Sequence, residues 1–373
     1  MDERNFDYES LPGRVVFGWG ASRSVLPAQV ETLGIERILL VHAEAETPIA
    51  ESVTAAFRDR VVGVFADVRP HVPIEVARAA RSRAATCGAE WVLSIGGGST
   101  TGTAKAVALE SGLPVIAVPT TYAGSEMTPI WGLTTRGRKE TGRDPKVLPR
   151  LVIYDPDLTL SLPQAVAIPS AFNALAHCVE SFYAPRANPV TSLLAEEGLR
   201  ALTSAVRRVS HEVEDRRGRE DLLYGAYLAG SAFGVAGSGL HHKICHALGG
   251  RLDLPHAETH TAVLPQVLAF NEPAMPREAE RIRRALAADG DGAAAGAATT
   301  VFDLISASGA TLSLAELGMP RQAVAGMVDE ILAAVPVDNP RAVSGDDVFE
   351  ILEAAFEGRR PTEAAPATTS SRS

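Results

Sequence analysis

Short apolar runs alternate with helical patterns along the first half of the chain. β-Branched or aliphatic runs occur at residues 37–43, 60–67, 90–99, 113–121 and 149–156, each bounded by Gly, Pro or polar residues. Helical stretches lie between them, for example at 74–89 and 101–111. Continuously apolar strands that alternate with helices are typical of a parallel sheet covered by helices on both faces. The pattern therefore predicts an N-terminal α/β domain.

The pattern changes near Leu162–Pro163, where strand-like runs almost vanish. Helical periodicity then continues over residues 163–184, 192–209, 218–250, 261–271, 276–288, 293–308, 321–334 and 346–357. We expect a Rossmann-like domain over residues 1–162 and an all-α domain over residues 163–358. Residues 359–373 are poor in apolar bulk and are expected to form a disordered tail.

Composition excludes several classes of function. The 373 residues are 46% hydrophobic and 21% charged, which is typical of globular domains, and the formal charge of −10 disfavours nucleic acid as a partner. Three cysteines without paired spacing favour a reducing compartment. The polar N-terminus is unlike a signal peptide, and no apolar run reaches the length of about 18 residues that a membrane span needs. We expect a cytoplasmic protein that acts on small molecules.

Two polar turns follow successive predicted strands. The first, Gly96 to Thr100, links an apolar strand to a helix, and the second begins at Pro119. Glycines after a strand let the backbone approach a pyrophosphate, and the following helix offers free N–H groups. The first turn alone is equally consistent with an ordinary strand–helix connection. The pair, at one edge of a parallel sheet, favours a dinucleotide site.

Histidines carry the candidate chemistry of the second half. His242 and His246 are four residues apart in a helical stretch, Asn173 and His177 repeat that spacing, and His256 stands in a loop-like segment. Residues at this spacing share a helix face, where imidazoles can ligate a metal, transfer protons or polarise a carbonyl. Because a neutral amide is a weak ligand, Asn173 argues against a tightly bound metal.

The order of these motifs resembles the iron-containing alcohol dehydrogenase superfamily, and within it the maleylacetate reductase branch. The likeness covers roughly residues 10 to 358. The segments that carry it are GGGST at 96–100, PTTYAGSEMTPIWGLT at 119–134, TGRDPKVLP at 141–149, YDPDL at 154–158, LHHKICHALGG at 240–250 and LPHAETHTAVLP at 254–265. The resemblance implies the fold of dehydroquinate synthase and iron-type alcohol dehydrogenases, with the active site between a Rossmann-like domain and a helical domain.

The resemblance also implies roles for individual residues. The cofactor-binding residues would be Gly96, Gly97, Gly98, Ser99, Thr100, Thr120, Thr121, Ser125 and Lys139. The catalytic set would be His246, His242, His177, His256 and Asn173, of which all but His246 occupy the metal-ligand positions of metal-dependent relatives. Lys243, His241 and Arg143 would bind the substrate carboxylates. Gln266 and Phe172 depart from the family pattern.

The implied reaction is reduction of the conjugated C=C of maleylacetate, or of a substituted analogue, to 3-oxoadipate in aromatic-compound degradation. NADH or NADPH would be the reductant, a small dicarboxylate the substrate, and a homodimer the assembly. Three alternatives remain open: a metal-dependent alcohol or aldehyde reductase, a lyase resembling dehydroquinate synthase, and a homologue recruited to a biosynthetic pathway. An acidic residue at the strand end would favour NADH. Because Ala43 holds that position and Glu44 only follows it, we expect both cofactors to support turnover.

Overall fold

A six-stranded parallel sheet forms the first half of the molecule. The structure, a computed structural model, describes residues 6–11, 13–136, 138–287, 296–335 and 338–362. The strand order is β1-β8-β5-β4-β2-β3. The strands are β1 (Arg14–Phe17), β2 (Ile38–Val41), β3 (Val61–Phe65), β4 (Trp91–Gly96), β5 (Val115–Pro119) and β8 (Leu151–Tyr154). The five predicted strands are confirmed, whereas β1, a four-residue edge strand, was not predicted.

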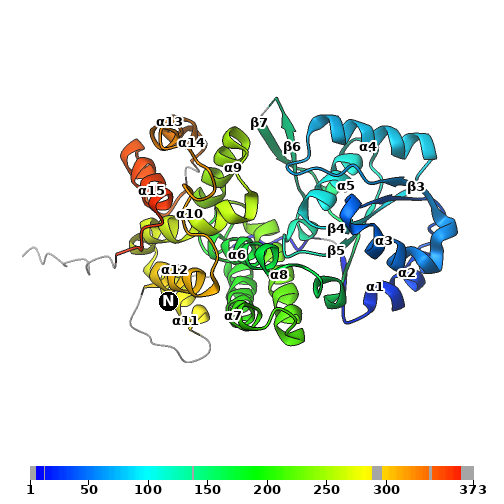
Figure 1. The fold of residues 1–373 in the computed structure, drawn as a ribbon, viewed down its shortest axis with the longest axis horizontal. Helices are drawn as coiled ribbons and strands as arrows, with labels where there is room; N and C mark the ends of the chain where they lie inside the picture. Colours follow the sequence, from blue (N-terminus) through cyan, green and yellow to red (C-terminus); the bar gives the residue numbers. More distant parts are fainter. Residues whose placement is uncertain (1–5, 12, 137, 288–295, 336–337, 363–373) are drawn as a thin grey trace, which may run out of the picture.

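Helices cover both faces of this sheet because its buried strands alternate apolar side chains between the faces (Figure 1). Leu40 packs with one helix layer, and Leu39 and Val41 pack with the other. The first layer comprises α1 (Ala21–Ser24), α2 (Leu26–Thr32) and α3 (Thr47–Thr54); the second comprises α4 (Ile74–Cys87) and α5 (Gly98–Ser111). The helix after β2 and the helix after β4 therefore lie on opposite faces. This is a topological switch point, where open α/β sheets bind ligands.

A two-stranded hairpin, β6 (Ile130–Thr135) and β7 (Arg138–Arg143), projects from the α/β half toward the helices. Figure 1 shows it between α4 and α9, and β7 packs against α9. The hairpin was missed from the sequence because β7 reads RKETGR and shows no apolar alternation. It matters because it carries Lys139 into the region between the two halves.

Helices follow Pro163 throughout the described part of the second half. They are α6 (Gln164–Glu180), α7 (Pro189–His211), α8 (Arg216–Ala236), α9 (Leu240–Leu252), α10 (His256–Asn271), α11 (Pro276–Leu286), α12 (Ala297–Ser308), α13 (Ala323–Gly326), α14 (Val328–Ala334) and α15 (Gly345–Glu357). The predicted helix 218–250 is two helices, because the chain reverses at Gly237, whose φ is 87°. His256 lies in the first turn of α10 and not in a loop, which corrects the expectation from sequence.

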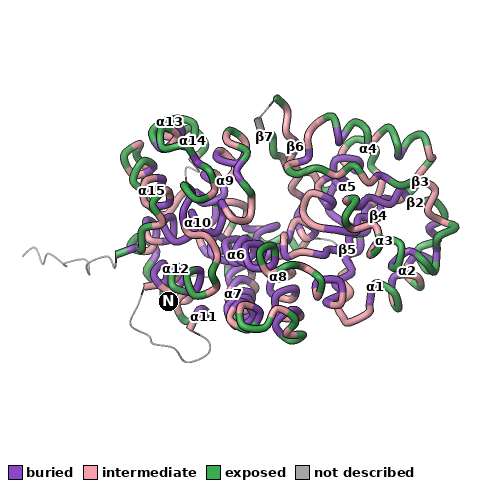
Figure 2. Tube along the Cα trace, in the orientation of Figure 1, coloured by how far each residue is buried: buried purple, intermediate pink, exposed green. Residues whose placement is uncertain are grey.

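The two halves share part of one core. Ala117, Val152 and Tyr154 of the sheet pack with apolar residues of α6, α7 and α8, and a second helical core joins α9, α10 and α15 (Figure 2). We propose the division between the halves at Leu162–Pro163, where the last strand gives way to α6. No helix in the described ranges is long and apolar enough to cross a membrane.

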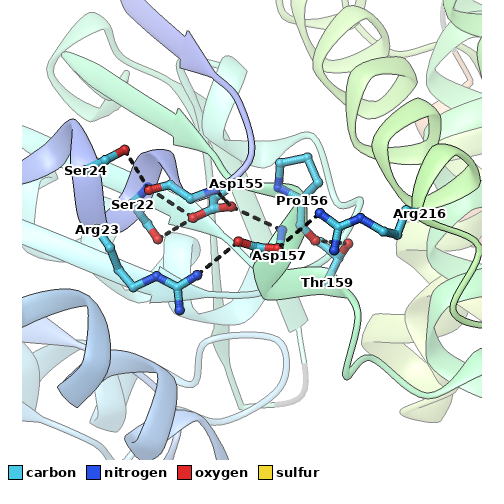
Figure 3. A network of polar contacts seen from close by, with 9 residues as sticks. Ser22, Arg23, Ser24, Asp155, Pro156, Asp157, Thr159 and Arg216 are labelled. Atoms are coloured by element: carbon cyan, nitrogen blue, oxygen red, sulfur yellow. Dashed lines mark hydrogen bonds and ion pairs between the residues drawn. The ribbon is translucent and has the colours of Figure 1, made fainter.

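A polar network at the end of β8 ties the halves together (Figure 3). The Asp155 carboxylate accepts hydrogen bonds from the backbone N–H groups of Gly20 (2.8 Å) and Ser22 (3.1 Å). Asp157 pairs with Arg23 of α1 (3.0 Å) and with Arg216 of α8 (3.8 Å). The YDPDL segment (residues 154–158) thus connects the α/β half to the helical half through these contacts.

The expected disordered tail is partly ordered. The Arg359 carbonyl accepts a hydrogen bond from Gln266 Nε2 (2.7 Å), and Arg360 pairs with Asp303 (2.8 Å). The start of the tail was therefore placed too early, and residues 363–373 lie outside the described residues. Gln266, which departs from the family pattern, makes one of these contacts through its side-chain amide.

Candidate active site

A cavity of about 590 Å³ lies between the two halves, beyond the carboxyl ends of β4 and β5. Both halves supply its walls. The α/β half contributes Gly98, Ser99, Thr121, Ser125 and Lys139, and the helical half contributes Asn173, His177, His242, Lys243, His246 and His256. Eleven of the residues singled out from the sequence thus converge on one cavity.

The turn after β4 fits the pyrophosphate of a dinucleotide. Helix α5 begins at Gly98 after the N-cap Gly97, and no side chain caps it, so the first N–H groups of the helix are left for an anion. A Cβ at Gly98 would lie 3.1 Å from Ala123 Cβ, and one at Gly97 would lie 3.1 Å from Thr121 Cγ2. Gly96 has a φ of +153°, which disfavours any side chain. Glycine at all three positions keeps this surface open.

Two threonines expected to bind the cofactor are turned toward a carboxylate that the sequence analysis overlooked. Thr100 Oγ1 and Thr120 Oγ1 donate hydrogen bonds to Glu46 (3.3 and 2.9 Å), and neither residue lines the cavity. Glu46 ends a 3₁₀ turn, Glu44–Glu46, and also accepts the N–H of Ala43 (3.1 Å). At the strand end, the sequence pointed only to Glu44 as a possible acid. Glu46, two residues after Glu44, completes the 3₁₀ turn and brings its carboxylate back to that strand end.

A buried lysine fixes the loop that carries Ser125. The Lys105 ammonium, on α5, donates to the carbonyl oxygens of Ser125, Thr128 (2.8 Å) and Ile130 (2.9 Å), and to Thr128 Oγ1 (3.1 Å). Burial lowers the pKa of Lys105, and the nearby charge of Glu126 opposes that shift. Four oxygen acceptors satisfy a group that would otherwise be costly to bury. Lys105 therefore couples helix α5 to the cavity wall.

The predicted polar pairs each share a helix face toward the cavity. Asn173 and His177 project from α6, His242 and His246 from α9, and His256 from α10. The rings of His177 and His242 stack at 4.9 Å, and those of His246 and His256 stack at 6.2 Å. Asn173 Oδ1, His177 Nδ1 and His242 Nε2 are buried and have no partner among the described residues. Such atoms need a polar ligand to satisfy them.

A buried carboxylate orients His242. Glu180, on α6, accepts a hydrogen bond from His242 Nδ1, and backbone N–H groups of Gly239, His241 and His242 favour its charged form. Burial raises the pKa of Glu180 against this effect. A proton held on Nδ1 leaves the lone pair of His242 Nε2 for the cavity. Glu180 was not singled out from the sequence, since nothing in the sequence marks this acid on α6 as the partner of His242 on α9.

The cavity imidazoles are neutral at ordinary pH. Burial, together with the charge of Lys139, lowers the pKa of His242 to about 3 and the pKa of His246 well below the usual 6.5. Burial likewise places the pKa of His177 and of His256 well below 6.5. Neutral imidazole donates from one nitrogen and accepts at the other. The imidazoles that line the cavity therefore offer hydrogen bonds as neutral groups and not as charged imidazolium acids.

Two residues expected to bind substrate do not reach the cavity wall. The Arg143 guanidinium donates to the Gly234 carbonyl (2.6 Å) and so links the hairpin to α8. His241 is fully buried and shares a hydrogen bond of 2.8 Å with His260, a histidine not singled out from the sequence. Adjacent residues of a helix point about 100° apart, so His241 does not share the face on which His242 lines the cavity. The structure therefore does not place Arg143 or His241 where they could contact a substrate in the cavity.

The residues do not fit a tightly bound iron ion. The four family positions, Asn173, His177, His242 and His256, supply only neutral donors, whereas a hard cation prefers at least one carboxylate. Among the described residues, the group of three or more His, Cys, Asp or Glu whose ligand atoms lie within 4.8 Å of one another is His241, Cys245 and His260.

In the metal-free protein that second group is held by its own hydrogen bonds. Its two imidazoles are hydrogen-bonded to each other, and burial raises the pKa of Cys245 well above its ordinary value. A metal bound there would have to separate the two imidazoles and displace the thiol proton. The three side chains form a hydrogen-bonded layer behind the cavity.

Two lysine ammonium groups and one carboxylate lie in the described wall of the cavity. Lys139 and Lys243 line it, and Glu258 is the one acidic side chain in its described wall. Lys139 has no hydrogen bond or ion pair with another described residue, and burial lowers the pKa of its amine. Its charge lies close enough to His242, His246 and His256 to lower the pKa of each. The hairpin thus brings a cation close to the histidines of the cavity.

A parallel α/β sheet with a glycine turn at its carboxyl edge, facing histidines on helices, defines a two-domain dehydrogenase architecture. The chain belongs to the iron-containing alcohol dehydrogenase family: the model for iron-containing alcohol dehydrogenases matches residues 12–156, and the model for the C-terminal part of the family matches residues 167–356.

Within this family the chain is similar to maleylacetate reductases. It is 46% identical to maleylacetate reductase of Burkholderia cepacia over 357 residues, which cover 96% of this chain and 99% of that protein. The crystal structure of maleylacetate reductase from Rhizobium sp. strain MTP-10005 superimposes with a TM-score of 0.88 at 42% identity, over 96% of this chain and 100% of that one. A putative alcohol dehydrogenase from Ralstonia eutropha JMP134 gives a TM-score of 0.92 at 48% identity, over 96% and 100%.

Proposed function

We propose that this chain catalyses NAD(P)H-dependent reduction of the conjugated C=C of maleylacetate, or of a substituted analogue, to 3-oxoadipate. One observation carries the proposal: neutral imidazoles and two ammonium groups share a cavity with an uncapped, glycine-lined helix N-terminus. The similarity to maleylacetate reductases over nearly the full chain supports it. The proposed product belongs to the degradation of aromatic compounds.

The proposed cofactor site runs along the sheet edge. Gly98 and Ser99 would hold the pyrophosphate, with Gly96 and Gly97 shaping the turn, and Thr121 and Ser125 would lie along the nicotinamide end. When bound, the dihydronicotinamide supplies the hydride that the reaction adds to the carbon β to the substrate ketone. Thr100 and Thr120 act on this site through Glu46.

The proposed role of the histidines follows from the charge that the reaction develops. Hydride addition at the β carbon moves an electron pair toward the ketone oxygen, and a proton must then reach the α carbon to complete the reduced C–C bond. His246, with no described hydrogen bond of its own, is free to donate to that oxygen, and Lys139 adds positive charge beside it. Donors aimed at developing negative charge are a major source of rate enhancement.

The remaining polar groups would complete the site. His242 Nε2, which Glu180 leaves as an acceptor, would hold the water or group that passes the proton, with His177, His256 and Asn173 around it. Conjugation lets a hydrogen-bond donor take the place of a Lewis acid, whereas an unactivated alcohol or aldehyde substrate lacks that help. The neutral donor set therefore suits the conjugated substrate.

The substrate is a dianion, and the cavity charge suits it. Lys243 would meet a substrate carboxylate, and the charge of Lys139 in the same cavity adds to the attraction, inside a protein whose formal charge is −10. Fixed cations in a recessed site attract an anion more strongly than the same charges on an open surface. We keep the homodimer as the proposed assembly, which sedimentation of the purified protein tests.

The experiment is oxidation of NADH by the purified chain with maleylacetate, compared with a simple aldehyde and repeated after chelation. We expect stoichiometric loss of reduced nicotinamide with maleylacetate alone, unchanged by the chelator. Turnover of the aldehyde that disappears on chelation would instead establish a metal-dependent alcohol or aldehyde reductase. Absence of any loss of NADH or NADPH with either compound would reject a net reductase.

A further inference from the structure

Glu46 places a carboxylate at the crevice between β2 and β4, where the sheet has its topological switch point. Three donors hold it in place: the N–H of Ala43, Thr100 Oγ1 and Thr120 Oγ1. Oε2 accepts two of these bonds and Oε1 accepts one. Since a carboxylate has about four acceptor positions, Oε1 retains one for a further donor.

The turn separates this carboxylate from the cavity. Gly98 and Ser99 face the cavity, whereas a Cβ at Gly96 would lie only 2.3 Å from Glu46 Oε2. A dinucleotide whose pyrophosphate rests on the turn and whose nicotinamide enters the cavity must leave the turn on the opposite side with its adenosine. On that side the crevice presents Glu46.

We propose that Glu46 recognises the adenosine ribose of the cofactor. It accepts a hydrogen bond from the 2′-hydroxyl, which favours NADH, and its negative charge disfavours the 2′-phosphate of NADPH. Ala43, at the strand end, has no acid to perform this function. Glu46 supplies the acid from one turn later and is bonded to the backbone of Ala43. The inference rests on the proposed function only in requiring that the chain binds a nicotinamide dinucleotide.

Glu44 offers a matched control. It lies two residues away on the same 3₁₀ turn, carries the same charge, and is exposed, and its side chain makes no hydrogen bond to the cofactor turn. Replacing either acid with glutamine removes one negative charge at nearly constant size. A difference between the two variants therefore reports the position of the charge and not its mere presence.

The test measures dissociation constants of NADH and NADPH on the full chain by nucleotide fluorescence, without substrate. Wild-type protein should bind NADH about 10- to 100-fold more tightly than NADPH, a range that still lets both support turnover. Glu46→Gln should reduce this ratio about tenfold, mainly by tightening NADPH, while Glu44→Gln should leave it unchanged. NADH lacking the adenosine 2′-hydroxyl should bind wild-type protein about tenfold more weakly than NADH.

Equal binding of NADH and NADPH by wild-type protein would overturn the proposal, and this measurement needs no variant to fold. So would a Glu46→Gln protein that loses both cofactors in the same proportion, because that result assigns Glu46 a structural role at Thr100 and Thr120 alone. An equal change in Glu44→Gln would assign the effect to long-range charge. Failure to reduce maleylacetate leaves these binding measurements intact, so the two proposals fail separately.

Discussion

Removal of the His246 imidazole tests the proposed chemistry most directly. The ring lies 5.9 Å from that of His242 and 6.2 Å from that of His256, and no hydrogen bond ties it to another described residue. The substitution His246→Ala therefore removes a cavity donor without breaking a bond that holds the fold. We expect the free energy of unfolding to change by less than about 1 kcal/mol.

The size of the effect on turnover follows from the groups that remain. Loss of one positioned donor to a developing oxyanion costs about 2.7–4 kcal/mol, or roughly 10²- to 10³-fold in kcat. Lys139 stays in place and continues to supply positive charge near the same oxygen. We therefore expect the lower end, a loss of about 10²-fold in kcat. The dissociation constant of NADH should change little, since the pyrophosphate turn lies on the other half of the molecule.

The assay is single-turnover reduction of maleylacetate at saturating NADH, together with nucleotide binding by fluorescence. His211→Ala, which removes an exposed histidine at the end of α7, is the control and should behave as wild type. His246→Gln keeps a donor on a longer side chain and should recover part of the loss. A His246→Ala enzyme that retains more than about a tenth of the wild-type kcat would refute the assignment.

Further predictions concern metal, substrate charge and acid. Purified protein should contain well under one equivalent of Fe or Zn and keep its rate after chelation. Asn173→Asp should raise metal occupancy and slow reduction. Activity that is lost on chelation and restored by adding the ion would contradict a metal-independent reaction. Lys243→Gln should raise KM for the dianion about tenfold with little change in kcat, and an unchanged KM would exclude Lys243 from binding. Burial lowers the pKa of His241 and His242 in the folded protein to about 3. In the unfolded chain each imidazole has its ordinary pKa of about 6.5, so below that pH the unfolded chain binds more protons than the folded protein. The free energy of unfolding should therefore be highest above pH ~6.5 and fall as the pH is lowered from ~6.5 toward ~3. A flat profile in denaturant titrations would show that these imidazoles take up protons in the folded protein as readily as in the unfolded chain.

Periodicity predicted the parts of the fold in which burial alone decides the structure. Ile38 to Val41 are all buried, and such continuous apolar strands were found from the sequence. The β6–β7 hairpin was missed because its polar strand is defined by pairing with β6 and packing against α9, which no local pattern records. The break between α8 and α9 depends on the positive φ of Gly237, whereas glycine also occurs within helices.

The candidate site was predicted best where the helical period fixes direction. Asn173 and His177, and likewise His242 and His246, reach the cavity together because four residues complete about one turn. Arg143 was misplaced because its guanidinium finds a carbonyl on α8, a tertiary contact invisible in sequence. Glu180 was overlooked for the same reason, whereas Glu46 was overlooked because a local 3₁₀ turn brings its carboxylate back to the strand end.

Lys105 has a consequence for the ionic requirements of the protein. Four oxygen atoms from residues 125–130 surround its ammonium, much as oxygen ligands would surround a small monovalent cation. The chain thus supplies a covalently attached cation to this loop from α5, the helix proposed to receive the cofactor phosphates. Order in this loop should not depend on which alkali metal the cell or the buffer provides, so exchange of potassium for sodium at constant ionic strength should leave cofactor affinity unchanged.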